Sequence, residues 1–277
     1  GIDWDQLNFR HIPIGVLSQV YENFSHRVDE LDSKARSVHY TPRSLAKLLV
    51  DEALAGLETP AHKAKILDPS CGAGVFLVLA LRELVRRRWA ADKERLGDKA
   101  RRPNKQVIES ILHNQIRGFD VSESALRLAA LGLYITVIEL NEITTPPSAH
   151  YATKALQGLV LFDQRTAEER TQTGFVLGSL GDAVDGKKFN GVFDVVVGNP
   201  PWSVLKKAKN ESEEEFKRRT ALLDGAGTET ARRVLKARGL GDVADDYRNP
   251  GGVPDLPFLW RAAEWAKPGG ILAFALD

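Results

Sequence analysis

The stretch AKILDPSCGAGVFLVLALRELVRR, residues 64–87, predicts a strand, a glycine turn and a helix in direct succession. A short apolar run ends at Asp68, Gly72 and Gly74 follow it, and a long apolar run then begins. Glycine lets a backbone approach a ligand closely, and the first turn of a helix offers free N–H groups to an anion. Such a unit is typical of an α/β protein, but a G-x-G turn alone does not identify its ligand.

Two common phosphate-binding patterns do not match this turn. No G-K-[ST] sequence follows the glycines, which disfavours the phosphate loop of nucleotide hydrolases. A dinucleotide site is also disfavoured, because residues 75–77 replace its third glycine and the next acid at a strand end lies well beyond the usual ~20 residues.

The same plan, an apolar run that ends in a polar residue, recurs along the chain. Further strands are predicted at residues 116–120, 175–182 and 193–199, which end in Asp120, Asp182 and Asn199, and the stretch GGILAFALD ends the chain as another strand. Helical patterns lie between these runs, and Ser122 is a predicted N-cap. We therefore expect a doubly wound, mostly parallel α/β sheet with helices on both faces and with ligands beyond the carboxyl ends of its strands.

Two segments are predicted along the chain, a helical lead-in at residues 1–60 and the α/β domain at residues 61–277. In the lead-in, residues 12–24 (IPIGVLSQVYENF) carry apolar side chains at helical spacing. Within residues 39–57 we expect a second helix, with Thr41 as N-cap, Pro42 as first residue, Gly56 as stop, and a buried face formed by Leu45, Leu48, Leu49 and Ala53.

Two charged segments interrupt the alternation of strands and helices. Residues 86–113 are basic and predicted to be a helical elaboration. Residues 205–249 are a highly charged insertion, long for a connection, and are either a mobile lid or an inserted helical pair.

The composition argues against a strongly basic, a membrane-spanning or a disulfide-bonded protein. Of 277 residues, 43% are hydrophobic and 27% charged, and a net charge of +1 gives no overall attraction to nucleic acid. No apolar run approaches the roughly 20 residues that span a bilayer, so we expect no membrane span. The single cysteine, Cys71, excludes an internal disulfide and favours a cytoplasmic location. The histidines show no metal-ligand spacing.

The chain has three unusual features. It begins with glycine, contains no methionine, and its last strand stops abruptly at residue 277. We therefore expect a fragment that is truncated after the fifth strand.

The acids at the predicted strand ends indicate a cofactor. Asp120, which ends the second strand, suits the two hydroxyl donors of a ribose. Asp182 could accept from an adenine amine, although Asp185 competes for this role, and Asp68 would favour a positively charged ligand beside the glycine turn. S-adenosylmethionine combines a ribose, an adenine and a cationic centre.

Five motifs together resemble those of the adenine-N6 type of DNA methyltransferase. They are HYTP at 39–42, DPSCGAGVFL at 68–77, GFD at 118–120, GD at 181–182 and NPPW at 199–202. Their order is similar to the gamma arrangement, and the lead-in resembles that of restriction–modification and phage-defence methylases. The resemblance implies a class I methyltransferase sheet of seven strands with S-adenosylmethionine across its carboxyl ends. Compared with that family, we expect a target-recognition domain and the last strands of the sheet to be missing from this sequence.

The resemblance also implies the residues of the site. The residues around Thr41 and the glycine turn would hold the methionine end of the cofactor, so the expected cofactor residues are Tyr40, Thr41, Pro42, Asp68, Pro69, Ser70, Cys71, Gly72, Gly74, Asp120 and Asp182. Cys71 is otherwise expected to be a small packing residue. The expected catalytic residues are Asn199, Pro200, Pro201 and Trp202, and no metal is expected.

The NPPW corner has a chemical rationale in such an enzyme. The lone pair of an adenine amine is delocalised into the ring, and two acceptors placed against its two N–H hydrogens localise that pair. The side-chain oxygen of Asn199 and the carbonyl of Pro200 are predicted to be these acceptors, and the two prolines hold them in place. Trp202 would stack on the base once it has left the duplex, and such stacking is worth about 1–3 kcal/mol.

Other functions stay open at this point. The corner would equally serve a methyltransferase that acts on cytosine N4 or on a protein glutamine, and a catalytically silent homologue would bind DNA or partner subunits only. Double-stranded DNA is the expected partner. Whether a nuclease, helicase or specificity subunit or domain accompanies the protein is also open.

Overall fold

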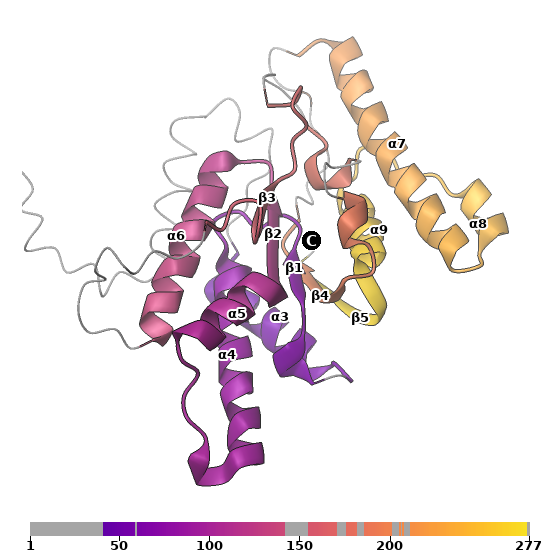
Figure 1. Cartoon of the computed structure of the whole chain (residues 1–277). Helices are drawn as coiled ribbons and strands as arrows, with labels where there is room; N and C mark the ends of the chain where they lie inside the picture. Colours follow the sequence, from indigo (N-terminus) through magenta and orange to yellow (C-terminus); the bar gives the residue numbers. More distant parts are fainter. Residues whose placement is uncertain are drawn as a thin grey trace, which may run out of the picture.

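The computed structural model describes residues 41–58, 60–141, 155–170, 176–181, 186–200, 205, 207 and 211–275. In this part of the chain, parallel strands form one five-stranded sheet in the order β3-β2-β1-β4-β5 (Figure 1). The strands are β1 (Ile66–Asp68), β2 (Ile116–Asp120), β3 (Leu161–Asp163), β4 (Phe193–Gly198) and β5 (Ala266–Phe274). The predicted helix at residues 12–24 lies outside the described residues.

Strand β1 lies at the centre of the sheet and positions the site. It pairs with β2 on one side and with β4 on the other, so the chain first builds the sheet in one direction and then reverses. Asp68 is in register with Gly118, and Asp120 with Asp163, so that the carboxyl ends of β1, β2 and β3 are aligned. Ligands of doubly wound sheets bind at the carboxyl ends, where the strand order reverses.

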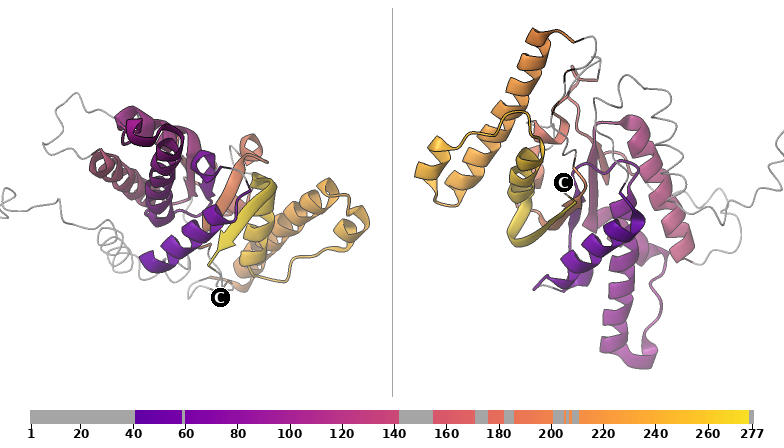
Figure 2. Two further views of the ribbon diagram at one scale, coloured as in Figure 1. Left: turned by 90° about the horizontal axis from the view of Figure 1, so that it is seen from below. Right: turned by 180° about the vertical axis from the view of Figure 1, so that it is seen from behind.

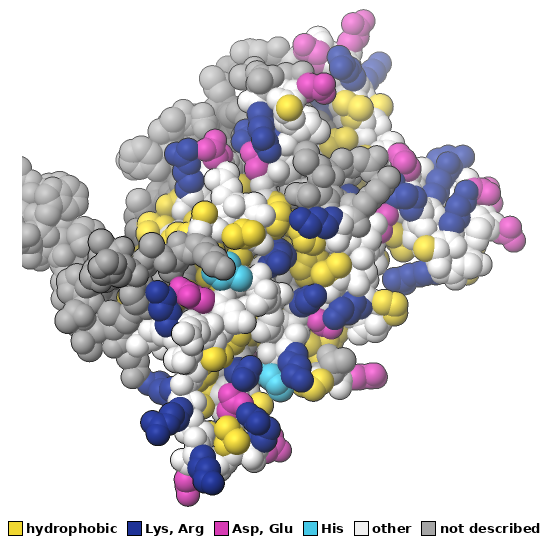
Figure 3. Space-filling view, viewed as in Figure 1, with side chains coloured by type: hydrophobic (Ala, Val, Ile, Leu, Met, Phe, Trp, Pro, Cys, Tyr) yellow, Lys and Arg dark blue, Asp and Glu magenta, His cyan; other side chains and the backbone are white. Residues whose placement is uncertain are grey.

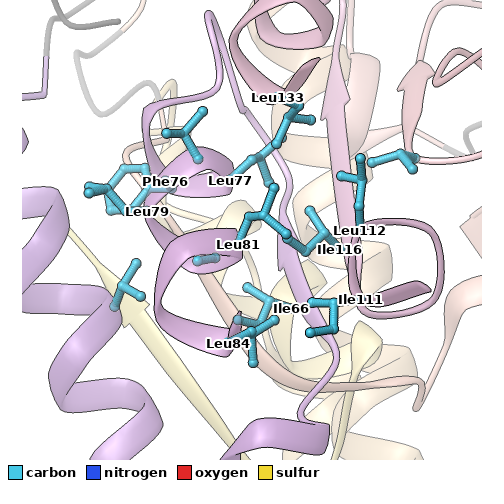
Figure 4. Close-up of a cluster of buried hydrophobic side chains, with 14 of the residues drawn as sticks. Ile66, Phe76, Leu77, Leu79, Leu81, Leu84, Ile111, Leu112, Ile116 and Leu133 are labelled. Atoms are coloured by element: carbon cyan, nitrogen blue, oxygen red, sulfur yellow. The ribbon is translucent and has the colours of Figure 1, made fainter. Parts of the chain in front are cut away.

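In the described part of the chain, four helices cover one face of the sheet. They are α3 (Arg43–Ala55), α4 (Val75–Leu96), α5 (Lys105–Gln115) and α6 (Glu123–Leu140). Ile66 of β1 and Val195 of β4 point into the core on this side, where they meet the first half of α4. Figure 4 shows Phe76, Leu77, Leu81 and Leu84 of α4 among these side chains. Because the first half of α4 lies within this core, its sequence is a nearly continuous run of apolar residues.

A second core lies on the opposite face. Leu67 and Val196, which alternate with the residues of the first core, pack here against α9 (Asp255–Trp265) and the 3-10 helix η6 (Gly186–Phe189). An aromatic cluster fills the space, with the rings of Phe119 and Trp265 at 5.5 Å and close to edge-to-face. Helices on both faces confirm the predicted doubly wound α/β fold (Figure 2).

The charged insertion forms helices. Helix α7 (Glu213–Ala237) packs against α9, and the short α8 (Gly241–Asp246) packs against α7 (Figures 1 and 2). Ser212 and Glu215 make reciprocal side-chain and backbone hydrogen bonds that cap the start of α7. Of the two predicted alternatives, the helical pair is therefore confirmed for residues 213–246.

The basic elaboration at residues 86–113 is also helical, as predicted. It comprises the end of α4, the 3-10 helix η4 (Gly97–Lys99) and most of α5. Several of its arginines are paired with acids, for example Arg88 with Asp92. On the face that Figure 3 shows, basic and acidic side chains are interspersed, in keeping with the net charge of +1.

The prediction of a third strand at residues 175–182 is wrong. The third strand is Leu161–Asp163, whereas residues 178–180 form the 3-10 helix η5 (Gly178–Leu180). Gly178 has a φ of +52°, which is incompatible with a strand. Both segments are apolar runs that precede an aspartate, and only the pairing with β2 distinguishes them.

Two details of the predicted helix at residues 39–57 are corrected. Its N-cap is Pro42 rather than Thr41, and the N-cap makes no side-chain hydrogen bond. Its buried face consists of Ala46, Val50, Ala53 and Leu54, while Leu45 and Leu48 are exposed. The small alanines let the helix approach the core closely. The stop at Gly56 and the cap of α6 by Ser122 are confirmed.

A search of the described residues finds no helix that is long and apolar enough to cross a membrane. The same residues contain no cluster of three or more metal-ligating side chains.

Candidate functional site

The glycine turn between β1 and α4 is fixed by backbone hydrogen bonds. The N–H of Cys71 donates to the carbonyl of Phe119 at 2.8 Å, and the N–H of Gly74 donates to the carbonyl of Cys71 at 2.8 Å. Gly74 has a φ of +87°, and a Cβ added there would lie 2.9 Å from the Cβ of Ala129 in α6. Gly74 is thus required both by its backbone conformation and by the close approach of α6.

Asp68 is completely buried at the carboxyl end of β1. Its Oδ1 accepts from the N–H of Ser70 at 3.1 Å, but its Oδ2 has no hydrogen-bond partner among the described residues. Burial raises the pKa of Asp68 well above its usual range, the Ser70 hydrogen bond opposes this, and nearby Asp120 adds to it. A buried carboxyl oxygen without a partner is costly, which marks it as a candidate contact for a ligand.

Asp120 is held at the end of β2 by backbone donors. Its Oδ2 accepts from the N–H of Gly72 and its Oδ1 from the N–H of Ser122, both at 2.8 Å. Burial raises the pKa of Asp120 although these backbone hydrogen bonds lower it in part. The carboxylate therefore links the glycine turn to the start of α6, and each oxygen retains further acceptor capacity.

Asn199 joins three predicted motifs. Its Nδ2 donates to Oγ1 of Thr41 at 3.0 Å, and its backbone carbonyl accepts from Oγ of Ser70 at 3.4 Å. Thr41 is buried, Asn199 is half-buried, and Pro200 is buried. The side chain of Asn199 therefore contacts Thr41 of the YTP motif, and its backbone contacts Ser70 of the glycine turn.

Position 198, directly before Asn199, has room only for a glycine. A Cβ added to Gly198 would lie 2.8 Å from Oδ1 of Asp68. The ends of β1 and β4 are thus in direct contact, and a side chain at residue 198 would separate them.

The remaining predicted residues have simpler environments or lie outside the described part. Pro42 is exposed at the start of α3. Cys71 is buried, and its pKa is raised well above the usual range by burial and by the two neighbouring aspartates. This environment agrees with the predicted packing role. Four predicted residues are outside the described residues: Tyr40, Asp182, Pro201 and Trp202.

One strand-end acid, Asp163, was missed in the sequence. It follows Phe162 at the end of β3, directly beside Asp120. Arg165 donates from Nε to Oδ1 of Asp163 at 3.0 Å and from a terminal nitrogen to Oδ2 at 2.7 Å. Burial alone would raise the pKa of Asp163, but Arg165 and Arg170 lower it below its usual range. The apolar run at residues 160–162 was the available signal.

A second contact that was not predicted from the sequence holds the glycine turn in place, through Ser179. Oγ of the buried Ser179 donates to the carbonyl of Pro69 at 2.6 Å. Arg261 of α9 in turn donates to the carbonyls of Ser179 and Gly181, at 3.3 and 3.2 Å. Neither Ser179 nor Arg261 stands in a recognisable motif.

Two curated proteins are similar to parts of this chain. The type I restriction enzyme MjaIX methylase subunit of Methanocaldococcus jannaschii is 39% identical over 71 residues, which cover 26% of this chain and 12% of that protein. The adenine-specific methyltransferase PglX of Streptomyces coelicolor is 24% identical over 210 residues, which cover 69% of this chain and 16% of that protein. The chain thus spans only a small part of these relatives.

Solved structures share the fold. A DrdV–DNA complex matches 98% of this chain with a TM-score of 0.55 at 16% identity, over 23% of its own chain. The type ISP restriction–modification enzyme LlaBIII bound to DNA matches 94% with a TM-score of 0.52 at 17% identity, over 16% of its own chain. The model of the family described as N-6 DNA Methylase matches residues 13–231. With most of its length matched by this model, the chain belongs to the N-6 DNA Methylase family.

Proposed function

We propose that this chain is the methyl-transferring part of an adenine-N6 DNA methyltransferase that uses S-adenosylmethionine. The observation that carries the proposal is the pair of hydrogen bonds that join Asn199 to Thr41 and to Ser70. The side-chain amide at the end of β4 contacts Thr41, and the backbone of the same residue contacts the glycine turn, which supports a role of this amide as the acceptor for the target amine. Family membership supports the same activity.

The residues at the carboxyl edge fit the cofactor. The unpartnered Oδ2 of Asp68 suits the positively charged methionine end, and Asp120 suits the ribose hydroxyls. At Gly72, which has a φ of +50°, an added Cβ would meet no atom within 4 Å among the described residues, so a ligand can approach this backbone. The role of Asp182 at the adenine amine stays a prediction. When bound, the cofactor would supply a methyl group on a positively charged sulfur.

The residues of the corner would activate and orient the base. Nδ2 of Asn199 contacts Thr41, and its Oδ1 is the other branch of the same amide and would be the acceptor for the base. This oxygen and the carbonyl of Pro200 would accept the two N–H hydrogens of the adenine amine and localise its lone pair. The amine nitrogen would gain the methyl group as the sulfur–carbon bond breaks, the sulfur would keep that electron pair and become neutral, and the extra proton of the nitrogen would then pass to solvent. Trp202 would stack on the flipped base.

Double-stranded DNA is the proposed partner, and the modification step of a restriction–modification or phage-defence system is the proposed setting. The LlaGI structure, a nuclease-deletion mutant of a type ISP enzyme in complex with a DNA substrate mimic, has the same fold over 94% of this chain. An accompanying nuclease, helicase or specificity part and a cytoplasmic location stay predictions.

Two measurements test the proposal. Calorimetric titration of the chain with S-adenosylmethionine should show binding. Incubation with duplex DNA and tritiated cofactor, followed by hydrolysis to nucleosides, should place the label in N6-methyladenine. Label in N4-methylcytosine or in protein glutamine would contradict the adenine assignment, and cofactor binding without any transfer would identify a silent homologue.

A further inference from the structure

Arg261 of α9 connects the core of the second face to the site. Its side chain is buried and donates to the carbonyls of Ser179 and Gly181 at 3.3 and 3.2 Å. Ser179 in turn donates its hydroxyl to the carbonyl of Pro69 in the glycine turn. A buried guanidinium therefore holds residues 179–181, and through them one side of the proposed cofactor site.

Helix α7 is linked to Arg261 through Glu264, which pairs with an arginine of each helix. Glu264 pairs with Arg261 and, at 2.9 Å, with Nε of Arg233 in α7. The guanidinium of Arg261 also lies 5.0 Å from the ring centroid of Trp265. The position of Arg261 is consequently fixed by both α9 and α7.

Helix α7 makes a second connection, to the segment that follows NPPW. Oδ1 of Asp224 accepts from the N–H of Gly252 at 2.9 Å and from Nδ2 of Asn249 at 3.0 Å. The carbonyl of Gly252 accepts from the N–H of Leu205 at 3.0 Å. Leu205 follows Asn199 and Pro200 closely in the sequence, so this connection fixes the chain a short distance downstream of these two residues.

The two connections belong to one packed unit. Leu205 packs against a cluster formed by Leu180, Leu223 and Phe258, which come from the segment at residues 176–181, from α7 and from α9. Gly227 of α7 allows this packing, because a Cβ there would lie 2.6 Å from Cγ of Pro257. Helices α7 and α9 are thereby fixed to each other while each reaches a different loop of the site.

We propose that α7 and α9 form a positioning unit with two separable arms. The Arg261 arm holds residues 179–181 against the glycine turn and sets cofactor affinity. The Asp224 arm holds Gly252 and Leu205 and sets the position of the catalytic corner. This inference rests on the proposed function, and it gives the charged insertion a role in the site other than that of a lid.

The two arms predict different kinetic effects. Arg261→Lys keeps the buried positive charge beside Glu264 but cannot reach both carbonyls in the geometry of a guanidinium. The worth of one charge-assisted hydrogen bond sets the upper limit of the effect, so we expect the Kd of S-adenosylmethionine to rise by up to about tenfold, with kcat at saturating cofactor unchanged. Asp224→Ala should leave this Kd unchanged and lower kcat on duplex DNA by about tenfold.

Calorimetry with S-adenosylmethionine and single-turnover methyl transfer at saturating cofactor measure the two effects. Arg232→Lys is the matched control, because Arg232 donates to the carbonyls of Asp245 and Tyr247 at the C-terminal end of α8. It should change neither quantity. Thermal unfolding and circular dichroism verify folding, and Asp224→Asn, which keeps the shape of the side chain and removes its charge, replaces Asp224→Ala should that variant not fold.

The outcomes distinguish this inference from the proposed function. Wild-type protein without cofactor binding or transfer would overturn the proposed function itself. Wild-type protein that binds and transfers, with an Arg261→Lys variant whose melting temperature falls but whose Kd does not change, would show a merely structural role. An equal change of Kd and kcat in both variants would overturn the separation into two arms.

Discussion

Nδ2 of Asn199 donates a hydrogen bond to Oγ1 of Thr41 at 3.0 Å, although the two residues are 158 positions apart in the chain. The bond fixes which branch of the amide faces the YTP motif and which faces away from it. Thr41, which does not cap α3, therefore orients the proposed catalytic amide.

Replacing Thr41 by valine should slow methyl transfer. Valine has the shape of threonine but cannot accept the hydrogen bond from Asn199, and loss of one such bond predicts a decrease in kcat of about 3- to 10-fold. Single-turnover transfer at saturating cofactor checks this. Thr41→Ser keeps the hydroxyl and should retain most of the activity. Equal rates for Thr41→Val and the wild type would show that the bond does not orient the amide.

Replacing Gly198 by alanine should destabilise the fold. The added Cβ would lie 2.8 Å from Oδ1 of the buried Asp68, so the Asp68 carboxyl group or the strands that carry the two residues must shift. We expect the free energy of unfolding to fall by about 1–3 kcal/mol in urea denaturation. Gly225 is the control, because an added Cβ there meets no atom within 4 Å among the described residues. Gly225→Ala in the exposed face of α7 should raise stability by up to about 1 kcal/mol. A loss of stability as large as that of Gly198→Ala would contradict the steric explanation.

Asp68→Asn should stabilise the protein and weaken cofactor binding. The pKa of Asp68 is raised in the folded state, mainly by burial, so its ionisation opposes folding. The unfolded carboxyl releases its proton near pH 4, and the penalty grows as pH rises from there toward the folded pKa. Thermal unfolding should therefore show Asp68→Asn above the wild type at pH 8, with a difference that shrinks toward pH 4. A difference that is constant between these pH values would exclude the ionisation of Asp68 as its cause.

The thiol of Cys71 should be unreactive in the folded protein. Its pKa is raised well above the usual range by burial and by Asp120 and Asp68, and the thiolate is the reactive form. A disulfide reagent such as DTNB at pH 8 should label Cys71 only after unfolding in guanidinium chloride. Rapid stoichiometric labelling of the native protein would contradict the packing role.

The sequence predicted the parts of the fold that depend on local pattern. The strands that end in Asp68 and Asp120 and the strand before Asn199 are each a short apolar run followed by a polar residue, and the structure confirms them. The third strand could not be chosen in this way, because two apolar runs before an aspartate compete. The pairing of Leu161 with Gly118 decides between them, and pairing is a tertiary property.

The motifs of the site could be predicted from the sequence, but the residues that hold these motifs in place could not. The motifs named Thr41, Ser70 and Asn199, and the structure joins them by hydrogen bonds. Ser179 and Arg261 stand in no motif, and they act through backbone carbonyls that any sequence provides. The exposed position of Leu45 and Leu48 was missed for a similar reason, since the orientation of α3 depends on the sheet against which it packs.

The most direct measurement of the central claim is methyl transfer by Asn199→Ala. The proposed role of Asn199 predicts that this variant binds S-adenosylmethionine with nearly wild-type affinity and transfers no tritiated methyl group to adenine-containing duplex DNA. Incorporation of label into adenine by the variant at a rate close to that of the wild type would contradict the account.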